Sequence, residues 1–354
     1  MRVTRRSRDF IVLVAAVIGL SLGADAAQLA TFDPGPYLSA QRLVDIGGRR
    51  LNLYCSGTSS PTVVLDAGLG GTMALWRLVQ LQVAKTTRVC SYDRAGMGFS
   101  DPAPPPRDAA AIVTDLHALL HRAGIAPPYV VVGHSVAGLY DRLYADRYPN
   151  DVAGMVLVDP VYPHQARDFE MSAPVFAKSL ATEETFFSKC SAAASSHELI
   201  PGSTIFGACG LLDATELRKQ CDIDGFAICR FDELQNNQQS TAAYWQETAS
   251  EYEAMRGASS TEVQNEQRNY GNLPLMVLTR EKGGFGDTDT PVSAEQNLEM
   301  WKQMHAAHQR IAATSTAGTD VVVAHSGHDI QFEYPAAVIF AIEKVVDQVR
   351  RAQP

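Results

Sequence analysis

The chain has 354 residues, of which 46% are apolar and 19% are charged, and its net charge is −9 at pH 7. This balance excludes a disordered chain and a membrane protein with many spans. An acidic chain also lacks the basic surface that nucleic acids require, so we expect a small-molecule substrate and no nucleic-acid partner.

The first 26 residues have the pattern of an export signal. Arginines occupy four of the first eight positions, an apolar stretch runs from 10 to 22, and Ala24-Asp25-Ala26 offers a small-residue cleavage site. The apolar stretch is shorter than the roughly 20 residues that span a bilayer, so we expect cleavage and no stable membrane insertion. The sequence therefore predicts a periplasmic or secreted protein.

Six cysteines fit an oxidising compartment and are candidates for disulfides. Two lie in strand-like segments and four lie in one stretch of the second half of the chain: Cys55 and Cys90, then Cys190, Cys209, Cys221 and Cys229. None of them has the spacing of a zinc site, so we expect no bound metal. Spacing alone leaves three pairings open for the cluster of four.

From about residue 42 the chain alternates short apolar runs with helical patterns, which predicts a mainly parallel sheet covered by helices. Residues 42–57 resemble two strands joined at Gly47-Gly48. Buried strands, which are almost continuously apolar, are expected at 62–68, 87–93, 129–135 and 153–160. Helical spacing of apolar residues is found at 108–123 and again between the last two of these strands.

The alternation stops after Pro160 and resumes at residue 273. Residues 161–272 show helical patches without a convincing strand, which predicts a helical cap that carries the four clustered cysteines. Further strands are expected at 273–279 and 319–327, and helices at 293–312 and 335–349. The predicted organisation is a signal peptide (1–26), a core (27–160 and 273–354) and the cap between its two parts.

Residues 133–138, Gly-His-Ser-Val-Ala-Gly, lie where an apolar strand becomes a helix. A sharp turn there lifts a serine hydroxyl clear of the sheet and tolerates only small neighbours, which Gly133 and Ala137 supply. A serine that only caps a helix would not need those small neighbours. We therefore interpret Ser135 as a nucleophile.

A nucleophilic serine needs a base, and His328 is the best candidate among nine histidines. It follows a predicted strand late in the chain, and loops at the carboxyl ends of parallel strands share one edge of the sheet. His325 lies three residues earlier and is the alternative base. His134, inside the turn itself, is expected to support the turn.

Two backbone N–H groups can form an oxyanion hole, which stabilises the negative oxygen of a tetrahedral intermediate. One belongs to Val136, the residue after the nucleophile, and the other to Leu69 in the glycine-rich loop after strand 62–66. Asp93 and Arg94 also lie near this edge, where we interpret them as a local ion pair that holds the following loop.

Five segments together resemble the α/β-hydrolase superfamily, in particular its capped esterase and peptidase-like branch: TVVLDAGLGGTMALW, VCSYDRAGMGFSDP, VVGHSVAGLY, GMVLVDP and SGHDI. The resemblance covers about 42–160 and 273–350. It implies a mostly parallel eight-stranded sheet with helices on both faces and with strand order 1-2-4-3-5-6-7-8. In that order the strands of Cys55 and Cys90 are neighbours, which implies a bridge between them and pairing of the cap cysteines among themselves.

The acid of the catalytic triad is open between two places. Many relatives carry it a few residues beyond the strand at 273–279, where Asp287, Asp289 or Glu281 could serve. Other relatives carry it at the end of the preceding core strand, where this chain has Asp159. We favour Asp159 over Asp287.

These residues predict an exported serine hydrolase that cleaves a carboxylic ester through an acyl-enzyme on Ser135 and that requires no cofactor. A peptidase, a lactonase and a carbon–carbon bond hydrolase use the same triad and remain alternatives. Enzymes of this fold that act on epoxides or haloalkanes carry Asp instead of Ser at the turn. The rival of another class is a non-catalytic binding protein on the same fold, but such proteins usually lose the serine or the late histidine, and this chain keeps both.

Overall fold

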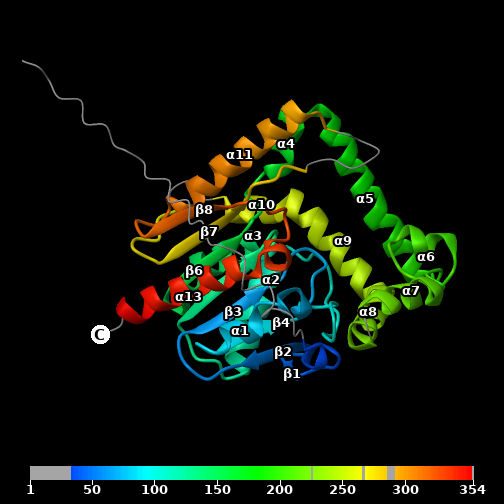
Figure 1. Ribbon diagram of the computed structural model, residues 1–354, viewed down its shortest axis with the longest axis horizontal. Helices are drawn as coiled ribbons and strands as arrows, with labels where there is room; N and C mark the ends of the chain where they lie inside the picture. Colours follow the sequence, from blue (N-terminus) through cyan, green and yellow to red (C-terminus); the bar gives the residue numbers. More distant parts are fainter. Residues whose placement is uncertain (1–32, 225, 265–267, 285–291, 353–354) are drawn as a thin grey trace, which may run out of the picture. The chain divides into compact units, whose positions relative to one another are not determined.

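Eight strands form one sheet, in which only the first two strands run antiparallel to their neighbours (Figure 1). The structure is a computed structural model that describes residues 33–224, 226–264, 268–284 and 292–352. All of these residues fall within one compact unit. The strands are β1 (Arg42–Asp45), β2 (Arg50–Ser56), β3 (Thr62–Asp66), β4 (Val89–Tyr92), β5 (Tyr129–His134), β6 (Val152–Val158), β7 (Leu275–Arg280) and β8 (Gly318–Val323).

The strands lie in the order β1-β2-β4-β3-β5-β6-β7-β8, which confirms the predicted fold class. Strands β3 to β8 are parallel, so their carboxyl ends share one edge of the sheet. The order reverses direction at β3, because β4 and β5 lie on its opposite sides. Ligands of open parallel sheets bind at the carboxyl edge beside such a point.

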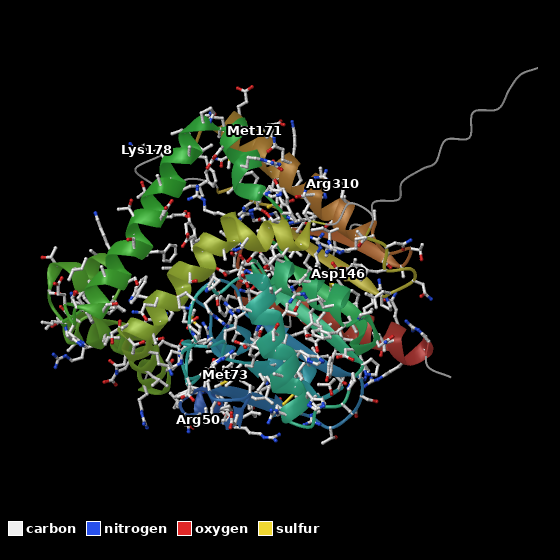
Figure 2. All side chains as sticks on the ribbon, turned by 180° about the vertical axis from the view of Figure 1, so that it is seen from behind. Arg50, Met73, Asp146, Met171, Lys178 and Arg310 are labelled. Atoms are coloured by element: carbon white, nitrogen blue, oxygen red, sulfur yellow. A yellow bond between two sulfur atoms is a disulfide. The ribbon has the colours of Figure 1, made fainter. Side chains whose placement is uncertain are left out.

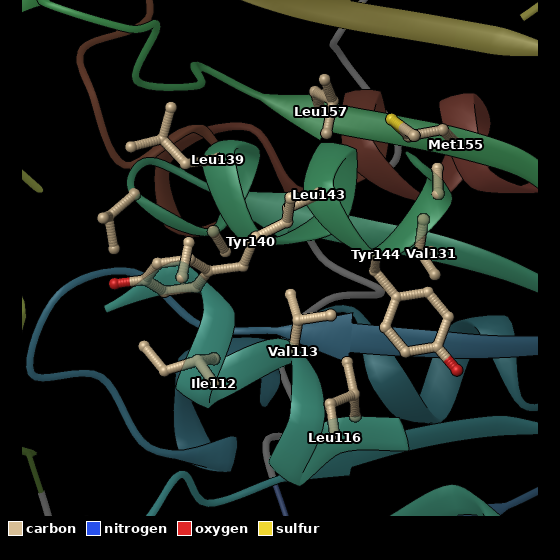
Figure 3. Close-up of a cluster of buried hydrophobic side chains, with 14 of the residues drawn as sticks. Ile112, Val113, Leu116, Val131, Leu139, Tyr140, Leu143, Tyr144, Met155 and Leu157 are labelled. Atoms are coloured by element: carbon tan, nitrogen blue, oxygen red, sulfur yellow. The ribbon is translucent and has the colours of Figure 1, made fainter. Parts of the chain in front are cut away.

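Helices cover both faces of the sheet because both faces of its strands are apolar. Along β5, Val131 packs with α2 (Ala109–Arg122) and α3 (Ala137–Arg147), whereas Val130 and Val132 pack on the other side with α13 (Pro335–Ala352). The first of these clusters also includes α11 (Ala294–Ala312). Figure 3 shows how Ile112, Leu116, Leu139 and Leu143 fill the space between α2, α3 and the sheet. The alternating side chains of each strand thus anchor the two helical layers.

The predicted strand at 319–327 is too long. Strand β8 ends at Val323, and the N–H of Ser326 donates back to the carbonyl of Val323. His325 has a backbone φ of +62°, which an extended strand cannot accommodate. The turn between β8 and α12 (Ile330–Glu333) therefore carries the candidate base His328.

Residues 161–272, which we call the insertion, contain helices and no strand among their described residues. They are α4 (Gln165–Ser172), α5 (Pro174–Ser195), α6 (Thr204–Ala208), α7 (Ala214–Asp224), α8 (Phe226–Gln239), α9 (Ala242–Arg256) and α10 (Ala258–Val263). The remaining short elements are α1 (Gln80–Val83) and the 3-10 helices Gly35–Tyr37, Met73–Trp76 and Pro149–Asp151.

The insertion has a small hydrophobic cluster of its own, which includes Phe206, Leu211 and Trp245. Its last two helices also contact the core: the N–H of Ala109 donates to Ser259 (2.9 Å) and that of Ala103 to Glu247 (2.8 Å). Figure 2 shows α4 and α5, marked by Met171 and Lys178, on one side of the core and Arg50 and Met73 on the other. The division into a core and a cap domain remains a prediction.

Candidate active site

The turn after β5 places Ser135 at the carboxyl edge of the sheet. Its backbone φ is +56°, a conformation that is rare for a residue with a side chain, and its N–H donates to the carbonyl of Val158 (3.0 Å). A Cβ at Gly133 would lie 2.4 Å from the carboxylate of Asp141 and 2.9 Å from the backbone of Ala137. Only glycine fits that position, which is the physical reason for the small residues around this serine.

His328 lies between Ser135 and Asp159. Its Nε2 is 3.0 Å from Ser135 Oγ, and its Nδ1 is 2.6 Å from Asp159 Oδ2. A carboxylate can only accept a hydrogen bond, so Nδ1 carries the proton and Nε2 accepts from the serine hydroxyl. Three side chains that follow β5, β6 and β8 thus form one hydrogen-bonded chain, from Ser135 through His328 to Asp159. This is the arrangement that a nucleophile, a base and an acid require.

Asp159 directly follows β6 and is only 3% exposed. Its Oδ1 accepts the N–H of Arg280 (3.1 Å), and the Arg280 Nε lies 3.5 Å from Oδ2. Burial raises the pKa of Asp159, but the hydrogen bond from His328 and the charge of Arg280 outweigh burial and lower the pKa to about 2. The group next to His328 is therefore a carboxylate at all ordinary pH values.

Among the described residues, the alternative acid Glu281 and the alternative base His325 do not join this chain. Asp287 and Asp289 lie outside the described residues. Glu281 accepts the N–H of His325 (2.8 Å), and the His325 side chain is 78% exposed. Glu281 and His325 thus pair with each other at the surface.

His134 contacts the candidate base His328. Its Nε2 lies 3.1 Å from the backbone carbonyl of His328, and the two rings are 4.7 Å apart. Burial, aided by the nearby His328, lowers the pKa of His134 to about 3. A neutral His134 therefore donates from Nε2 and holds the loop of His328, in addition to its expected place in the turn.

The loop Ala67–Gly71, which we call the β3 loop, packs directly on the serine turn. A Cβ at Gly68 would lie 2.7 Å from His134 Nδ1 and 3.4 Å from Ser135 Cβ. The N–H of Gly71 donates to the carbonyl of Gly68 (3.0 Å) and closes the loop. Leu69, whose N–H we predicted as an oxyanion donor, lies inside this turn.

The predicted ion pair between Asp93 and Arg94 is wrong. Asp93 instead accepts the N–H groups of Met73 (2.7 Å) and Phe99 (3.1 Å) and the amide of Asn52 (2.9 Å). Arg94 points the other way and forms ion pairs with two buried carboxylates, those of Asp66 (2.9 Å) and Glu251 (2.8 Å). Successive side chains near a strand end alternate in direction, which separates the two neighbours.

Two residues near the site were missed in the sequence, Arg280 and Glu251. Arg280 ends β7 at the same edge as the other candidates, so the rule that singled out His328 could have found it. Glu251 lies in α9 of the insertion, more than one hundred residues away from its partner Arg94. No local pattern marks it, since only the tertiary fold brings the two together.

The described residues contain two disulfides. One joins Cys55 and Cys90, which face each other across β2 and β4, and one joins Cys190 and Cys209 in the insertion. The side chains of Cys221 and Cys229 lie outside the described part of the chain.

No helix among the described residues is long and apolar enough to cross a membrane. The same residues contain no group of three or more His, Cys, Asp or Glu side chains placed to hold a metal ion.

Two relatives from Bacillus subtilis each match part of the chain at the sequence level. YbdG and YqjL of Bacillus subtilis are 26% and 36% identical over 132 and 104 residues, which are 37% and 29% of this chain. The chain covers 41% of the length of each, so neither relative is matched as a whole.

Solved structures match most of the fold at low identity. A thermophilic esterase from Thermogutta terrifontis superimposes with a TM-score of 0.56 at 18% identity, covering 88% of this chain and 99% of the esterase. An enol-lactonase from Burkholderia xenovorans gives a TM-score of 0.51 at 16% identity, with 86% and 100% covered. The sequence model of the alpha/beta hydrolase family matches residues 63–341, most of the chain including the insertion, and the chain therefore belongs to that family.

Proposed function

We propose that the protein is a serine hydrolase that cleaves a carboxylic ester through an acyl-enzyme on Ser135. The observation that carries the proposal is His328, which hydrogen-bonds to Ser135 Oγ through one ring nitrogen and to the carboxylate of Asp159 through the other. A base oriented by a buried carboxylate is what a serine hydroxyl needs in order to act as a nucleophile.

In the first half of the reaction, Ser135 Oγ attacks the carbonyl carbon while His328 Nε2 takes the hydroxyl proton. Asp159 stabilises the resulting imidazolium through Nδ1–H. The tetrahedral intermediate then collapses, the bond to the leaving oxygen breaks, and His328 donates its proton to that oxygen. A water molecule then attacks the carbonyl carbon of the acyl-enzyme while His328 takes its proton. Collapse of this second intermediate releases the carboxylic acid and restores the serine hydroxyl.

The N–H groups of Leu69 and Val136 are the proposed oxyanion donors. Val136 precedes α3, and the first N–H groups of a helix have no partner within it. Within the described part of the chain, neither of the two N–H groups donates to another residue. Each donor is worth about 3–4 kcal/mol to the transition state of an acyl transfer.

An ester is the proposed substrate because the alkoxide that leaves an ester or a lactone is a far weaker base than the group that leaves a peptide or a carbon–carbon bond. The structurally similar proteins include an esterase and an enol-lactonase, which agrees with acyl transfer to water. Peptidase and carbon–carbon bond hydrolase activities need the same triad and a stronger proton donation to the leaving group.

We also propose that the protein is exported and that its N-terminal 26 residues are removed. The two disulfides support this proposal, since disulfides form and persist in oxidising compartments.

Labelling with a fluorophosphonate tests the nucleophile, because Ser135 Oγ would displace fluoride from phosphorus only if its hydroxyl is activated. We expect one adduct, found by peptide mass spectrometry on Ser135 and lost in both Ser135→Ala and His328→Ala. An unlabelled, folded protein with intact disulfides would contradict the hydrolase proposal and favour a binding protein.

The same assay separates the two candidate acids. Asp159→Asn should lower the labelling rate about 10³–10⁴-fold, because the imidazole then loses the acceptor that fixes its tautomer. Asp287→Asn is the matched control and should label at close to the rate of the unaltered protein. The reverse pattern would overturn the choice of Asp159.

A further inference from the structure

Arg94 is buried at the junction of the β3 loop, the core and the insertion. Its side chain is 2% exposed, and all five of its N–H hydrogens have an acceptor. Nε and Nη2 donate to the two oxygens of Glu251 (2.8 and 2.9 Å), Nη1 donates to Asp66 (2.9 Å) and to the carbonyl of Ala67 (2.6 Å), and Nη2 also donates to the carbonyl of Gly68 (2.6 Å). Such a saturated guanidinium has one orientation only.

The two carbonyl bonds reach the backbone of the β3 loop. In a trans peptide the C=O and the following N–H point in opposite directions, and the peptide between Gly68 and Leu69 is trans. The bonds from Arg94 and from the N–H of Gly71 hold the Gly68 carbonyl. They therefore also fix the direction of the Leu69 N–H, the proposed oxyanion donor.

The insertion supplies the other side of this contact. Tyr244, Thr248 and Glu251 lie on one face of α9 at helical spacing, and a Cβ on Gly70 would come within 2.9 Å of the Tyr244 hydroxyl and 3.4 Å of Thr248. Helix α9 thus packs against the outside of the β3 loop. Burial lowers the pKa of Arg94, but the carboxylates of Glu251 and Asp66 outweigh burial and raise it, so the guanidinium stays charged.

From this geometry we infer that Arg94 is a positioning residue for the oxyanion hole and that Glu251 of the insertion holds Arg94 in place. The insertion then contributes to the chemical step itself, through the orientation of one N–H group. The inference deepens the proposed function and rests on it.

Glu251→Gln tests the inference. The new amide places a donor opposite a guanidinium N–H, so Arg94 must reorient and the hold on the Gly68 carbonyl weakens. We expect kcat for p-nitrophenyl butyrate to fall about 10–100-fold with little change in KM, because the oxyanion exists only in the transition state. Arg94→Lys keeps the charge and loses the planar guanidinium group. It should likewise lower kcat with little change in KM.

A pair of inhibitors separates positioning from a merely structural role. Ser135 Oγ adds to a trifluoromethyl alkyl ketone, its proton passes to His328, and the former carbonyl oxygen becomes an anion. The corresponding trifluoromethyl alcohol binds without an adduct. We expect Glu251→Gln to weaken binding of the ketone by about the same factor by which it lowers kcat. The affinity for the alcohol should stay within about twofold of that of the unaltered protein.

Glu247→Gln is the matched control, one turn earlier on α9. Glu247 forms a similarly buried ion pair with Arg107 (3.0 Å) and accepts the N–H of Ala103, with no bond to the β3 loop. It should change the melting temperature about as much as Glu251→Gln while kcat stays within about threefold. If Glu251→Gln does not fold, Glu251→Asp replaces it, because this variant keeps the charge and lengthens the hydrogen bonds to Arg94. The affinities for the same ketone and alcohol are then measured with Glu251→Asp.

Equal ketone affinity in the Glu251 and Glu247 variants would overturn the inference and leave the proposed function intact. An unaltered protein that forms no adduct with the ketone or with a fluorophosphonate would overturn both. Loss of ketone affinity confined to the Glu251 and Arg94 variants would establish the link between the insertion and the oxyanion hole.

Discussion

At the scale of single residues, the candidate site depends on a histidine that is kept neutral. His134 is 3% exposed, and its pKa is lowered to about 3 because burial disfavours the imidazolium. A positive charge there would lie 4.7 Å from the ring of His328, ring centre to ring centre, and would oppose protonation of the base. In the proposed mechanism, the neutrality of His134 is thus part of what would allow His328 to accept the serine proton.

This neutrality makes the folded protein sensitive to acid. In the unfolded chain His134 takes up a proton near pH 6.5, whereas the folded protein resists protonation down to about pH 3. The contribution of His134 to the free energy of unfolding is therefore fully present well above pH 6.5. It is lost as the pH falls below that value, by about 1.4 kcal/mol per pH unit. Between pH 7 and pH 5 the free energy of unfolding, measured with urea, should fall by about 2 kcal/mol less in His134→Gln than in the unaltered protein.

His325→Gln is the control for this prediction, since that side chain is exposed and pairs with Glu281 at the surface. Some acid sensitivity should persist in His134→Gln because burial also lowers the pKa of His308. Identical losses in the unaltered protein and in His134→Gln would contradict the account.

At the scale of elements, the disulfide between Cys55 and Cys90 joins the antiparallel neighbours β2 and β4. The two cysteines are register partners in the sheet and are separated by 35 residues in sequence. Closing a loop of that length removes conformational freedom from the unfolded chain and is worth about 3–4 kcal/mol. We expect the double variant Cys55→Ala/Cys90→Ala to lose about that much free energy of unfolding in urea.

The second disulfide provides the comparison. Cys190 and Cys209 lie in the separate hydrophobic cluster of the insertion and close a shorter loop, with a separation of 19 residues. Cys190→Ala/Cys209→Ala should therefore destabilise the insertion first and leave the urea unfolding of the sheet, followed by hydrogen exchange at the amides of its strands, nearly unchanged. An unchanged stability of the Cys55/Cys90 double variant would show that the bond does not restrain the unfolded chain.

Most elements of the core could be predicted from the sequence because each carries a local signal. Strands such as β5 and β6 are covered on both faces and are continuously apolar, and α2 shows a single apolar face. The end of β8 was misplaced because an apolar run does not reveal where the backbone turns. The contacts of α9 with the β3 loop carry no local signal at all.

At the scale of the whole molecule, the site draws on segments from almost the full length of the chain. Ser135 and His328 could be predicted because motif and chain order mark them. For the candidate acid the sequence favoured Asp159 over Asp287 without deciding between them, since both follow core strands, and the fold brings Asp159 to within 2.6 Å of His328. The pairing of Glu251 with Arg94 could not be predicted, because a buried ion pair between distant segments has no sequence signature.

Export is a property of the whole chain and has a direct test. Expression of all 354 residues in a bacterial host should yield a periplasmic or secreted protein that begins at Ala27, as read from its intact mass. Ala26→Asp, which spoils the cleavage site, should leave the N-terminal segment attached. A mature protein that still begins at Met1 would contradict the signal-peptide prediction.

The bonds around the serine turn have a further consequence. The N–H of Ser135 donates to the carbonyl of Val158 and the N–H of Val161 donates to the carbonyl of Ser135, so the proposed nucleophile and Asp159 are joined within one continuous stretch of chain. His328 belongs to a second stretch on the far side of the insertion. A chain divided inside the insertion would thus keep two members of the proposed triad on one fragment and the third on the other. Under the proposed function, hydrolysis of an ester would then show that the two fragments had reassembled.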